Sequence, residues 1–351
     1  MAESLTENLE AETETAFEEG ASVEILALNA SDTPAVTANQ FQSLATGFNA
    51  LSRLSWAADQ DLLTTLDRQR GLALWDMRLS QPRAKSLPVA NQYGEVTSFA
   101  LGGLSQESLL LATGSRTGVV NLWTVTTRSL NEERFFAARL KQTLNQATHL
   151  GAVSDMIFSR DGRLLISASE RSGEVFLWDS ESGALLEKWH HGTGAIIQLA
   201  FNDDESLLAA ASADGSIGLW ELASGQARAN LNLNNSGSLQ SILFIGQDKI
   251  LAAYRNSLNE GTLRLWQGDK LLSEALGRET EYLALLDDEL IASAHRDGSI
   301  MLWQFNPELR PLRELQAATN RRLSGLVYVS FTKILVVGYR DGLMELWPLS
   351  E

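Results

Sequence analysis

The chain has 351 residues, 44% hydrophobic and 21% charged, a composition typical of a folded globular protein. Its net charge of -16 disfavours broad binding to nucleic acid, and no apolar run reaches the roughly 18 residues that a membrane span needs. The absence of cysteine excludes disulfides and thiolate metal sites. Because the N-terminus lacks the regions of a secretory signal, we expect a cytoplasmic protein that binds neither nucleic acid nor membrane.

Residues 1–20 are acidic, with seven Glu and neither Lys nor Arg. This composition is typical of a solvated, disordered tail, and recruitment of a basic partner is the alternative. The next segment, SVEILAL at residues 22–28, has the alternation and length of one β-strand. Residues 29–46 are expected to form a long loop into the first repeat, and loops of this length are often functional.

A repeated unit begins near residue 46. Seven of the nine Trp end a short apolar strand that follows a Gly-containing turn, as in RGLALW and DGSIGLW. These are Trp75, Trp123, Trp178, Trp220, Trp266, Trp303 and Trp347. Their intervals of 48, 55, 42, 46, 37 and 44 residues match the length of a four-stranded propeller blade.

Upstream of each Trp lie an alternating strand, a polar turn and a strand of small residues. The pattern is clearest in VSDMIFSRDGRLLISASERSGEVFLWD, which starts at Val153. We therefore predict an all-β fold, a seven-bladed β-propeller of four-stranded antiparallel blades. Residues 21–351 are expected to form this single domain.

The connection between Trp123 and Gly151 is unusually long and contains NEERFFAARLKQTL. Its FFAARL stretch is predicted to be an outer strand. A short amphipathic helix is the alternative, because Phe136, Leu140 and Leu144 recur at a spacing of four residues.

The last repeat lacks an outer strand, since only four residues follow Trp347. An unpaired strand edge promotes aggregation, so we expect residues 22–28 to complete the last blade and close the ring. A separate N-terminal strand is the alternative. Closure by this segment predicts that deletion of residues 1–30 lowers the melting temperature sharply and that deletion of residues 1–18 does not.

These strings resemble the WD-repeat family over about residues 46–351. The family often carries an Asp six residues before the Trp, a Gly-His upstream and a Ser or Thr in the second strand. Asp214, Asp297 and Asp341 match the Asp, whereas His149 best fits the His position in a repeat that has Ser172 in place of the Asp. The resemblance implies that this buried polar network is mostly absent and that the blades depend on apolar packing. It also implies a non-enzymatic scaffold or adaptor.

No motif for catalysis, metal binding or cofactor binding is present. The four His show no zinc-site spacing and are interpreted as turn or cap residues: His149, His190, His191 and His295. His190 and His191 should point to opposite sides of an extended strand. The sequence contains neither a phosphate-binding Gly-rich loop nor a GxSxG elbow, and the acidic pairs 203–204 and 287–288 fit solvated turns. We therefore expect no enzyme activity, no metal and no cofactor.

Alignment of the repeats on their Trp reveals a column rich in Arg, seven residues before each Trp. In chain order it contains Arg68, Arg116, Arg171, Ala213, Asn259, Arg296 and Arg340. With 22 Arg in 351 residues, fewer than one Arg is expected among seven positions. In a closed ring the five Arg would belong to blades six, seven, one, two and three. They would form an arc along the turns between second and third strands, on the face that WD-repeat proteins commonly use for partners.

Guanidinium groups bind carboxylates and phosphates through paired hydrogen bonds. We therefore interpret the five Arg as residues that bind a protein with an acidic or phosphorylated surface. A regulatory or sensor subunit that binds an anionic ligand on the same face is the alternative function. Solvated turn residues or weak surface ion pairs are the structural alternative. The propeller by itself is expected to be monomeric.

Overall fold

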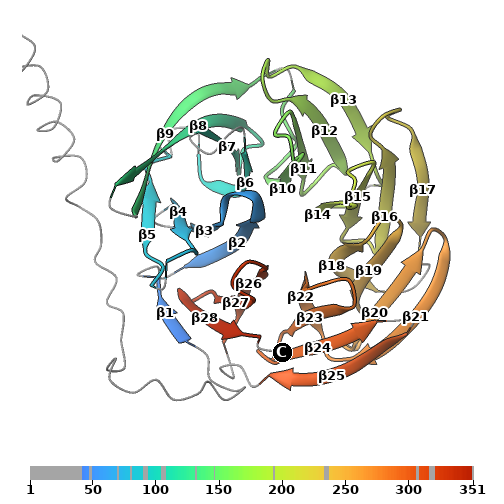
Figure 1. Cartoon of the computed structure of the whole chain (residues 1–351). Helices are drawn as coiled ribbons and strands as arrows, with labels where there is room; N and C mark the ends of the chain where they lie inside the picture. Colours follow the sequence, from blue (N-terminus) through green and yellow to red (C-terminus); the bar gives the residue numbers. More distant parts are fainter. Residues whose placement is uncertain are drawn as a thin grey trace, which may run out of the picture.

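The computed structural model describes residues 42–349, apart from residues 47–49, 69–70, 80, 90–93, 104–107, 131–132, 146, 193, 233–236, 306–307 and 316–320. Within this part of the chain, 28 strands form seven four-stranded antiparallel sheets, and the one helical element is the 3-10 turn η1 (Ala58–Gln60). The sheets stand as blades around a central axis (Figure 1). The predicted seven-bladed β-propeller is confirmed. The acidic segment 1–20 lies outside the described residues.

Six blades use four strands that are consecutive in the chain. Blade 1 contains β2 (Leu51–Ala57), β3 (Leu62–Asp67), β4 (Gly71–Asp76) and β5 (Ala84–Leu87). Blade 2 contains β6 (Val96–Gly103), β7 (Ser108–Ser115), β8 (Val120–Leu130) and β9 (Glu133–Leu144). Blade 3 contains β10 (Val153–Phe158), β11 (Leu164–Ser169), β12 (Glu174–Asp179) and β13 (Leu185–His190). Blade 4 contains β14 (Ile196–Phe201), β15 (Leu207–Ser212), β16 (Ser216–Glu221) and β17 (Ala227–Asn232).

The remaining three blades complete the ring. Blade 5 contains β18 (Ser238–Ile245), β19 (Lys249–Arg255), β20 (Gly261–Gln267) and β21 (Lys270–Gly277). Blade 6 contains β22 (Thr280–Leu285), β23 (Leu290–His295), β24 (Ile300–Phe305) and β25 (Leu309–Leu315). Blade 7 contains β26 (Leu323–Val329), β27 (Ile334–Tyr339) and β28 (Leu343–Pro348), and its fourth strand is β1 (Gln42–Ala45).

The ring is closed by an N-terminal strand, as predicted, but a different segment supplies it. β1 pairs antiparallel with β28, and the hydroxyl of Thr46 donates a hydrogen bond to the carbonyl of Gly342 at 2.6 Å. At this edge the structure has residues 42–45 in place of the predicted segment 22–28, which lies outside the described residues. Two features explain the correction. First, only five residues separate β1 from β2. Second, the side chain of Leu44 in β1 is only 1% exposed and packs in the same core cluster as Met344 of β28.

The core lies between the blades. In the described residues the buried apolar side chains form seven clusters, and each cluster is shared by two neighbouring blades. Small residues in the second strands allow this close contact, because Ala209, Ala210 and Ala211 of β15 are fully buried. Each blade is therefore stabilised by its neighbours. The turns on the two faces of the ring are thus held on a stiff frame.

The long connection after Trp123 is a hairpin of two long strands, β8 and β9. The predicted outer strand is confirmed and the helix alternative is wrong. The hairpin contacts blade 1, where the guanidinium of Arg134 donates to both carboxylate oxygens of Asp76, at 2.6 and 2.8 Å. Burial by itself would raise the pKa of Asp76, but hydrogen bonds from Arg134 and Arg78 outweigh this effect and lower the pKa. The hairpin thus fastens blade 2 to blade 1.

Candidate functional site

The Trp of four blades hydrogen-bonds to a buried hydroxyl on the second strand. The indole N–H groups of these four residues donate at 2.7 to 3.0 Å in the pairs Trp75–Thr65, Trp123–Thr113, Trp178–Ser167 and Trp303–Ser293. The expectation that the buried network is mostly absent therefore needs correction. The hydrogen bond between Trp and the second-strand hydroxyl is present in four blades. The Asp and His members of the network are present in fewer blades.

His149 and His191 bring this network into blades 3 and 4. The Nε2 atom of His149 lies 2.7 Å from the hydroxyl of Ser167, and its ring stacks on Phe176 with centroids 4.1 Å apart. In blade 4 the hydroxyl of Ser216 donates to Asp214 at 2.6 Å and lies 2.8 Å from Nε2 of His191, which is therefore the donor of that bond. Both His lie in connections between strands, as the interpretation as turn residues expects, but their side chains are 3% and 4% exposed and belong to the buried network.

Of the two remaining His, His295 is buried and His190 is exposed. His295 is also buried, with Nε2 at 3.0 Å from the hydroxyl of Ser293. His190 is exposed while His191 is buried, which confirms the predicted opposite orientation. Space for His191 comes from Gly218, where an added Cβ would approach the imidazole ring to 2.8 Å. Burial lowers the pKa of His149 to about 4 and also lowers that of His295, so both rings are neutral at pH 7.

The inner strands of all blades enclose a channel that holds a cavity of about 1090 Å³. Four Arg and four acidic residues are part of its wall: Arg53, Arg68, Arg116, Arg340, Glu95, Asp155, Glu170 and Glu281. Arg53 of blade 1 and Asp155 of blade 3 form an ion pair at 3.0 Å. Burial raises the pKa of Asp155 against the opposing influence of Arg53 and of backbone N–H donors. The channel is therefore polar and nearly balanced in charge.

Strand pairing shows which turn residues are equivalent. In every blade the Trp pairs with a residue of the second strand. The residue five positions after this partner leads into the turn before the third strand. In blade order these residues are Arg68, Arg116, Glu170, Ala213, Arg255, Arg296 and Arg340. Two positions differ from those predicted by counting back from Trp. Glu170 replaces Arg171 and Arg255 replaces Asn259, because the turns of blades 3 and 5 are longer.

The backbone supports this assignment. The N–H groups of Arg68, Arg116, Arg296 and Arg340 each donate to the carbonyl of the residue just before the first strand of the same blade. The N–H of Glu170 makes the corresponding bond to Ala152. The five Arg of the structural column therefore belong to blades 5, 6, 7, 1 and 2, which are consecutive in the ring. We call Arg68, Arg116, Arg255, Arg296 and Arg340 the arginine arc.

Arg171 lies on the same face, in the turn of blade 3, but outside the arginine arc. Its side chain is 76% exposed and is 3.8 Å from Glu170. The Trp spacing missed Arg255, although a sequence signal was present. Lys249–Arg255 reads KILAAYR, and residues 333–340 of blade 7 read KILVVGYR, so an alignment on the second strands would have matched Arg255 with Arg340.

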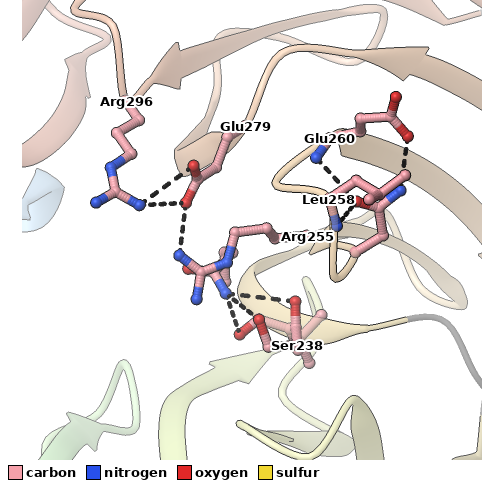
Figure 2. A network of polar contacts seen from close by, with 9 residues as sticks. Ser238, Arg255, Leu258, Glu260, Glu279 and Arg296 are labelled. Carbon is pink, nitrogen blue, oxygen red and sulfur yellow. Dashed lines mark hydrogen bonds and ion pairs between the residues drawn. The ribbon is translucent and has the colours of Figure 1, made fainter.

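Acidic residues hold part of the arginine arc in place. The carboxylate of Glu279 accepts from Arg255 at 2.7 Å and from Arg296 at 3.1 and 3.3 Å, so one carboxylate joins blades 5 and 6 (Figure 2). Arg116 pairs with Glu95 at 3.3 Å, and Nε of Arg340 donates to a backbone carbonyl at 3.1 Å. Four of the five side chains of the arc thus make a polar contact with a neighbouring group, as expected if turn Arg residues pair with nearby acids.

Asp297 and Asp341 each organise their own turn. Asp297 accepts from the N–H and the hydroxyl of Ser299 at 2.9 and 2.6 Å, and Asp341 accepts from the N–H of Leu343 at 3.3 Å. Within the described part of the chain, no three His, Asp or Glu residues are grouped as metal ligands. No helix among these residues is long and apolar enough to cross a membrane.

The matches to known proteins agree with this architecture. The family model "WD domain, G-beta repeat" matches residues 139–179 and 183–221, the two repeats that contain the His149 and His191 networks. "Protein ROOT INITIATION DEFECTIVE 3" of Arabidopsis thaliana is 22% identical over 79% of this chain and 63% of its own length. "WD repeat and SOCS box-containing protein 1" of Homo sapiens is 28% identical over 33% of this chain and 25% of its own length. The chain thus matches less than two thirds of either relative.

A solved structure shares the fold over nearly the whole propeller. The structure titled "Structure of U3-55K" superimposes with a TM-score of 0.66 over 86% of this chain and 95% of that chain, at 17% sequence identity. Two repeats are close enough to the family model to match it, and all seven blades have the same Trp-to-second-strand pairing. The chain therefore has the seven-bladed β-propeller fold, and its repeats are similar to those of the WD-repeat family.

Proposed function

We propose that this protein is a non-enzymatic scaffold that recruits another protein through the face carrying the arginine arc. WD-repeat propellers generally act as protein-interaction scaffolds. The observation that carries the proposal is the placement of five Arg on equivalent turns of five consecutive blades. In a chain with a net charge of -16, five Arg on one face are not expected by chance. This placement therefore favours a partner with an acidic or phosphorylated surface.

The rigidity of the face supports this function. At four of the five arc positions a backbone hydrogen bond anchors the turn to the residue before the first strand, and the blades behind the turns share their cores. Preorganised guanidinium groups lose little conformational entropy on binding, so more of the contact energy appears as affinity. A rigid polar face of this kind is suited to docking.

The proposal also covers the environment of the protein. We place the scaffold in the cytoplasm, as a monomer before it meets its partner, with no binding to nucleic acid or membrane. The net charge of -16 supports this because phosphate-rich surfaces would be repelled except at the arginine arc.

Charge reversal tests the proposal directly. The double variant Arg116→Glu and Arg340→Glu should lose capture of partner proteins in an affinity purification from the native host. A matched control reverses Arg163 and Arg228, which are 81% and 57% exposed and lie outside the arc. Equal capture by both variants and the natural protein would contradict docking on this face.

A further inference from the structure

We infer that the arginine arc receives the acidic side chain of a partner peptide at one point, the mouth of the channel beside blades 5, 6 and 7. Arg340 and Glu281 line the cavity there, and Arg255 and Arg296 share the carboxylate of Glu279. The exposed Leu258 lies in the turn that follows Arg255. The inference rests on the proposed function and names the chemistry of the partner. It predicts a peptide segment that carries a carboxylate next to an apolar side chain.

The three Arg form one electrostatic unit. Arg255 and Arg296 both bind the carboxylate of Glu279, whose side chain is only 9% exposed. Two residues further along the chain, Glu281 lines the cavity together with Arg340. Arg340, Arg296 and Arg255 all favour the ionised form of Glu281, so this carboxylate lies within the electrostatic field of cations from three successive blades.

The balance of charge differs around the channel mouth. Blades 5 to 7 supply three Arg for two carboxylates, Glu279 and Glu281. In blade 2, Arg116 and Glu95 are paired one to one, and blade 3 has Glu170 in the arc position. An added carboxylate therefore finds more positive charge beside blades 5 to 7 than beside blades 2 and 3.

An apolar anchor lies next to this cationic group. The turn between β19 and β20 is folded around Asn256, whose side-chain oxygen accepts from the N–H groups of Leu258 and Glu260, both at 2.9 Å (Figure 2). Asn259 completes the turn at φ 62°, a conformation that Asn tolerates well. The turn holds Leu258 with its side chain 75% exposed. Leu258 therefore offers apolar contact to a bound segment in the turn that follows Arg255.

Glu281 acts in this site as an internal counter-ion. Burial raises its pKa, Glu279 adds to that effect, and Arg340, Arg296 and Arg255 oppose it. The neighbouring Tyr282 is also buried and has a raised pKa. A second carboxylate entering this group disfavours the ionised form of Glu281, so binding is accompanied by proton uptake. Affinity should therefore increase as the pH falls through the pKa of Glu281, until the carboxylates of the ligand are themselves protonated.

The cavity favours a peptide over a small free anion. Its wall carries four Arg and four acidic residues, so a small anion inside it meets little net field. A peptide crossing the mouth gains the local excess charge of blades 5 to 7, contact with Leu258 and hydrogen bonds of its own backbone. The total of these contacts, more than any single ion pair, makes a peptide segment the better ligand.

Fluorescence anisotropy with the full chain tests the inference. The probe is a fluorescein-labelled peptide of alternating glutamate and leucine, and its glutamine counterpart is the matched control. Arg340→Ala and Leu258→Ser should each weaken binding of the acidic peptide by on the order of tenfold. Glu281→Gln should strengthen binding and remove most of its pH dependence. Melting temperatures of the variants establish that each protein is folded.

Two further variants locate the site. Arg163→Ala, on the opposite end of the propeller, and Arg171→Ala, on the same face but outside the arc, should leave binding unchanged. A loss of binding in Arg171→Ala would overturn the placement at blades 5 to 7. So would equal binding of the acidic and glutamine peptides, or competition by inorganic phosphate at concentrations similar to the peptide.

The proposed function and this inference can fail separately. If partner capture survives reversal of Arg116 and Arg340, docking on the arginine arc is wrong. If capture is lost in that variant while Glu281→Gln and Leu258→Ser bind the acidic peptide as the natural protein does, the scaffold stands and the peptide site is wrong.

Discussion

Blades 3 and 5 bury equivalent Trp residues in different surroundings. In blade 3 the indole of Trp178 donates to Ser167 at 2.9 Å, and the same hydroxyl meets His149. In blade 5 the position of Ser167 is occupied by Ala252, and the N–H of Trp266 is buried with no hydrogen-bond partner among the described residues. Both blades nevertheless have four strands in the same register. The polar network is therefore not required for the shape of a blade.

The difference also concerns the turns. In blade 4 the turn before the third strand supplies Asp214 to the buried Ser216 and His191, so its conformation serves the core. In blade 5 no buried His depends on the turn, and the longer loop presents Leu258 to solvent. Loss of the network in one blade thus leaves its turn available for a surface role, at the cost of an unsatisfied indole.

The largest effect is expected from Ser167→Ala in blade 3. The substitution leaves the indole of Trp178 and Nε2 of His149 without their partner, and two buried unsatisfied groups cost about 4 kcal/mol. Urea denaturation at pH 7 measures the change. Ser182→Ala, in an exposed turn of the same blade, is the control and should cost under about 1 kcal/mol. A similar loss in both variants would remove the special role of the buried hydroxyl.

Acid should destabilise blade 3 through His149. The folded-state pKa of about 4 lies below the ordinary value of 6.5, so the unfolded chain binds more protons between these two pH values. Stability is therefore complete above pH 6.5 and decreases toward pH 4, by up to about 3 kcal/mol from this group. Denaturation midpoints of the natural protein and of His149→Gln, measured from pH 7 to pH 4, should diverge. His295 remains in both proteins, so a parallel decrease would show that His149 does not carry the effect.

The same substitution in the two blades should have unequal consequences. Trp178→Phe removes a satisfied donor and leaves the Ser167 hydroxyl with one contact fewer, whereas Trp266→Phe removes a donor that has no partner. Because the loss of aromatic area is similar, the blade 3 variant should be less stable by about 1–2 kcal/mol. Thermal unfolding of the two variants, side by side, gives this difference. Equal losses would mean that packing alone decides stability in both blades.

The smallest effect is a gain in blade 5. Ala252→Ser places a hydroxyl where four other blades hydrogen-bond their Trp, so the indole of Trp266 acquires an acceptor. Stability should increase by about 0.5–1.5 kcal/mol, the usual net contribution of one hydrogen bond. The equivalent change in blade 4, Ala210→Ser, is the comparison. A decrease in melting temperature would show that the fully buried Ala252 leaves no room for an added oxygen.

Several features of the propeller were predictable because they depend on local pattern. Period-two alternation, Gly turns and a terminal Trp recur seven times, and each repeat carries enough information to form one blade. The strand at FFAARL, residues 135–140, was also predicted, and the structure extends it to Glu133–Leu144. The same locality explains why counting back from Trp found equivalent turn positions at Arg68, Arg116, Arg296 and Arg340, where the turns have equal spacing to Trp.

Other features depend on which strands meet. Thr46 and Gly342 are 296 residues apart in sequence, and the alternating segment 22–28 looked a better strand than the four residues QSLA that pair with β28. The positions of Arg171 and Arg255 changed because turn length differs between blades, and only the pairing of each Trp with its second strand reveals the equivalence. The burial of His191 and His295 was not predicted, because it depends on how the blades pack and not on local spacing.

The sequence by itself thus determined the number of blades, the strand order within most of them and the face that gathers Arg, because these follow from short-range periodicity. The tertiary structure decided the closing strand, the members of the arginine arc and the convergence of Arg255, Arg296 and Arg340 on Glu281. Those depend on contacts between blades. Contacts between distant segments are set by the packing of the whole ring, which no single repeat encodes.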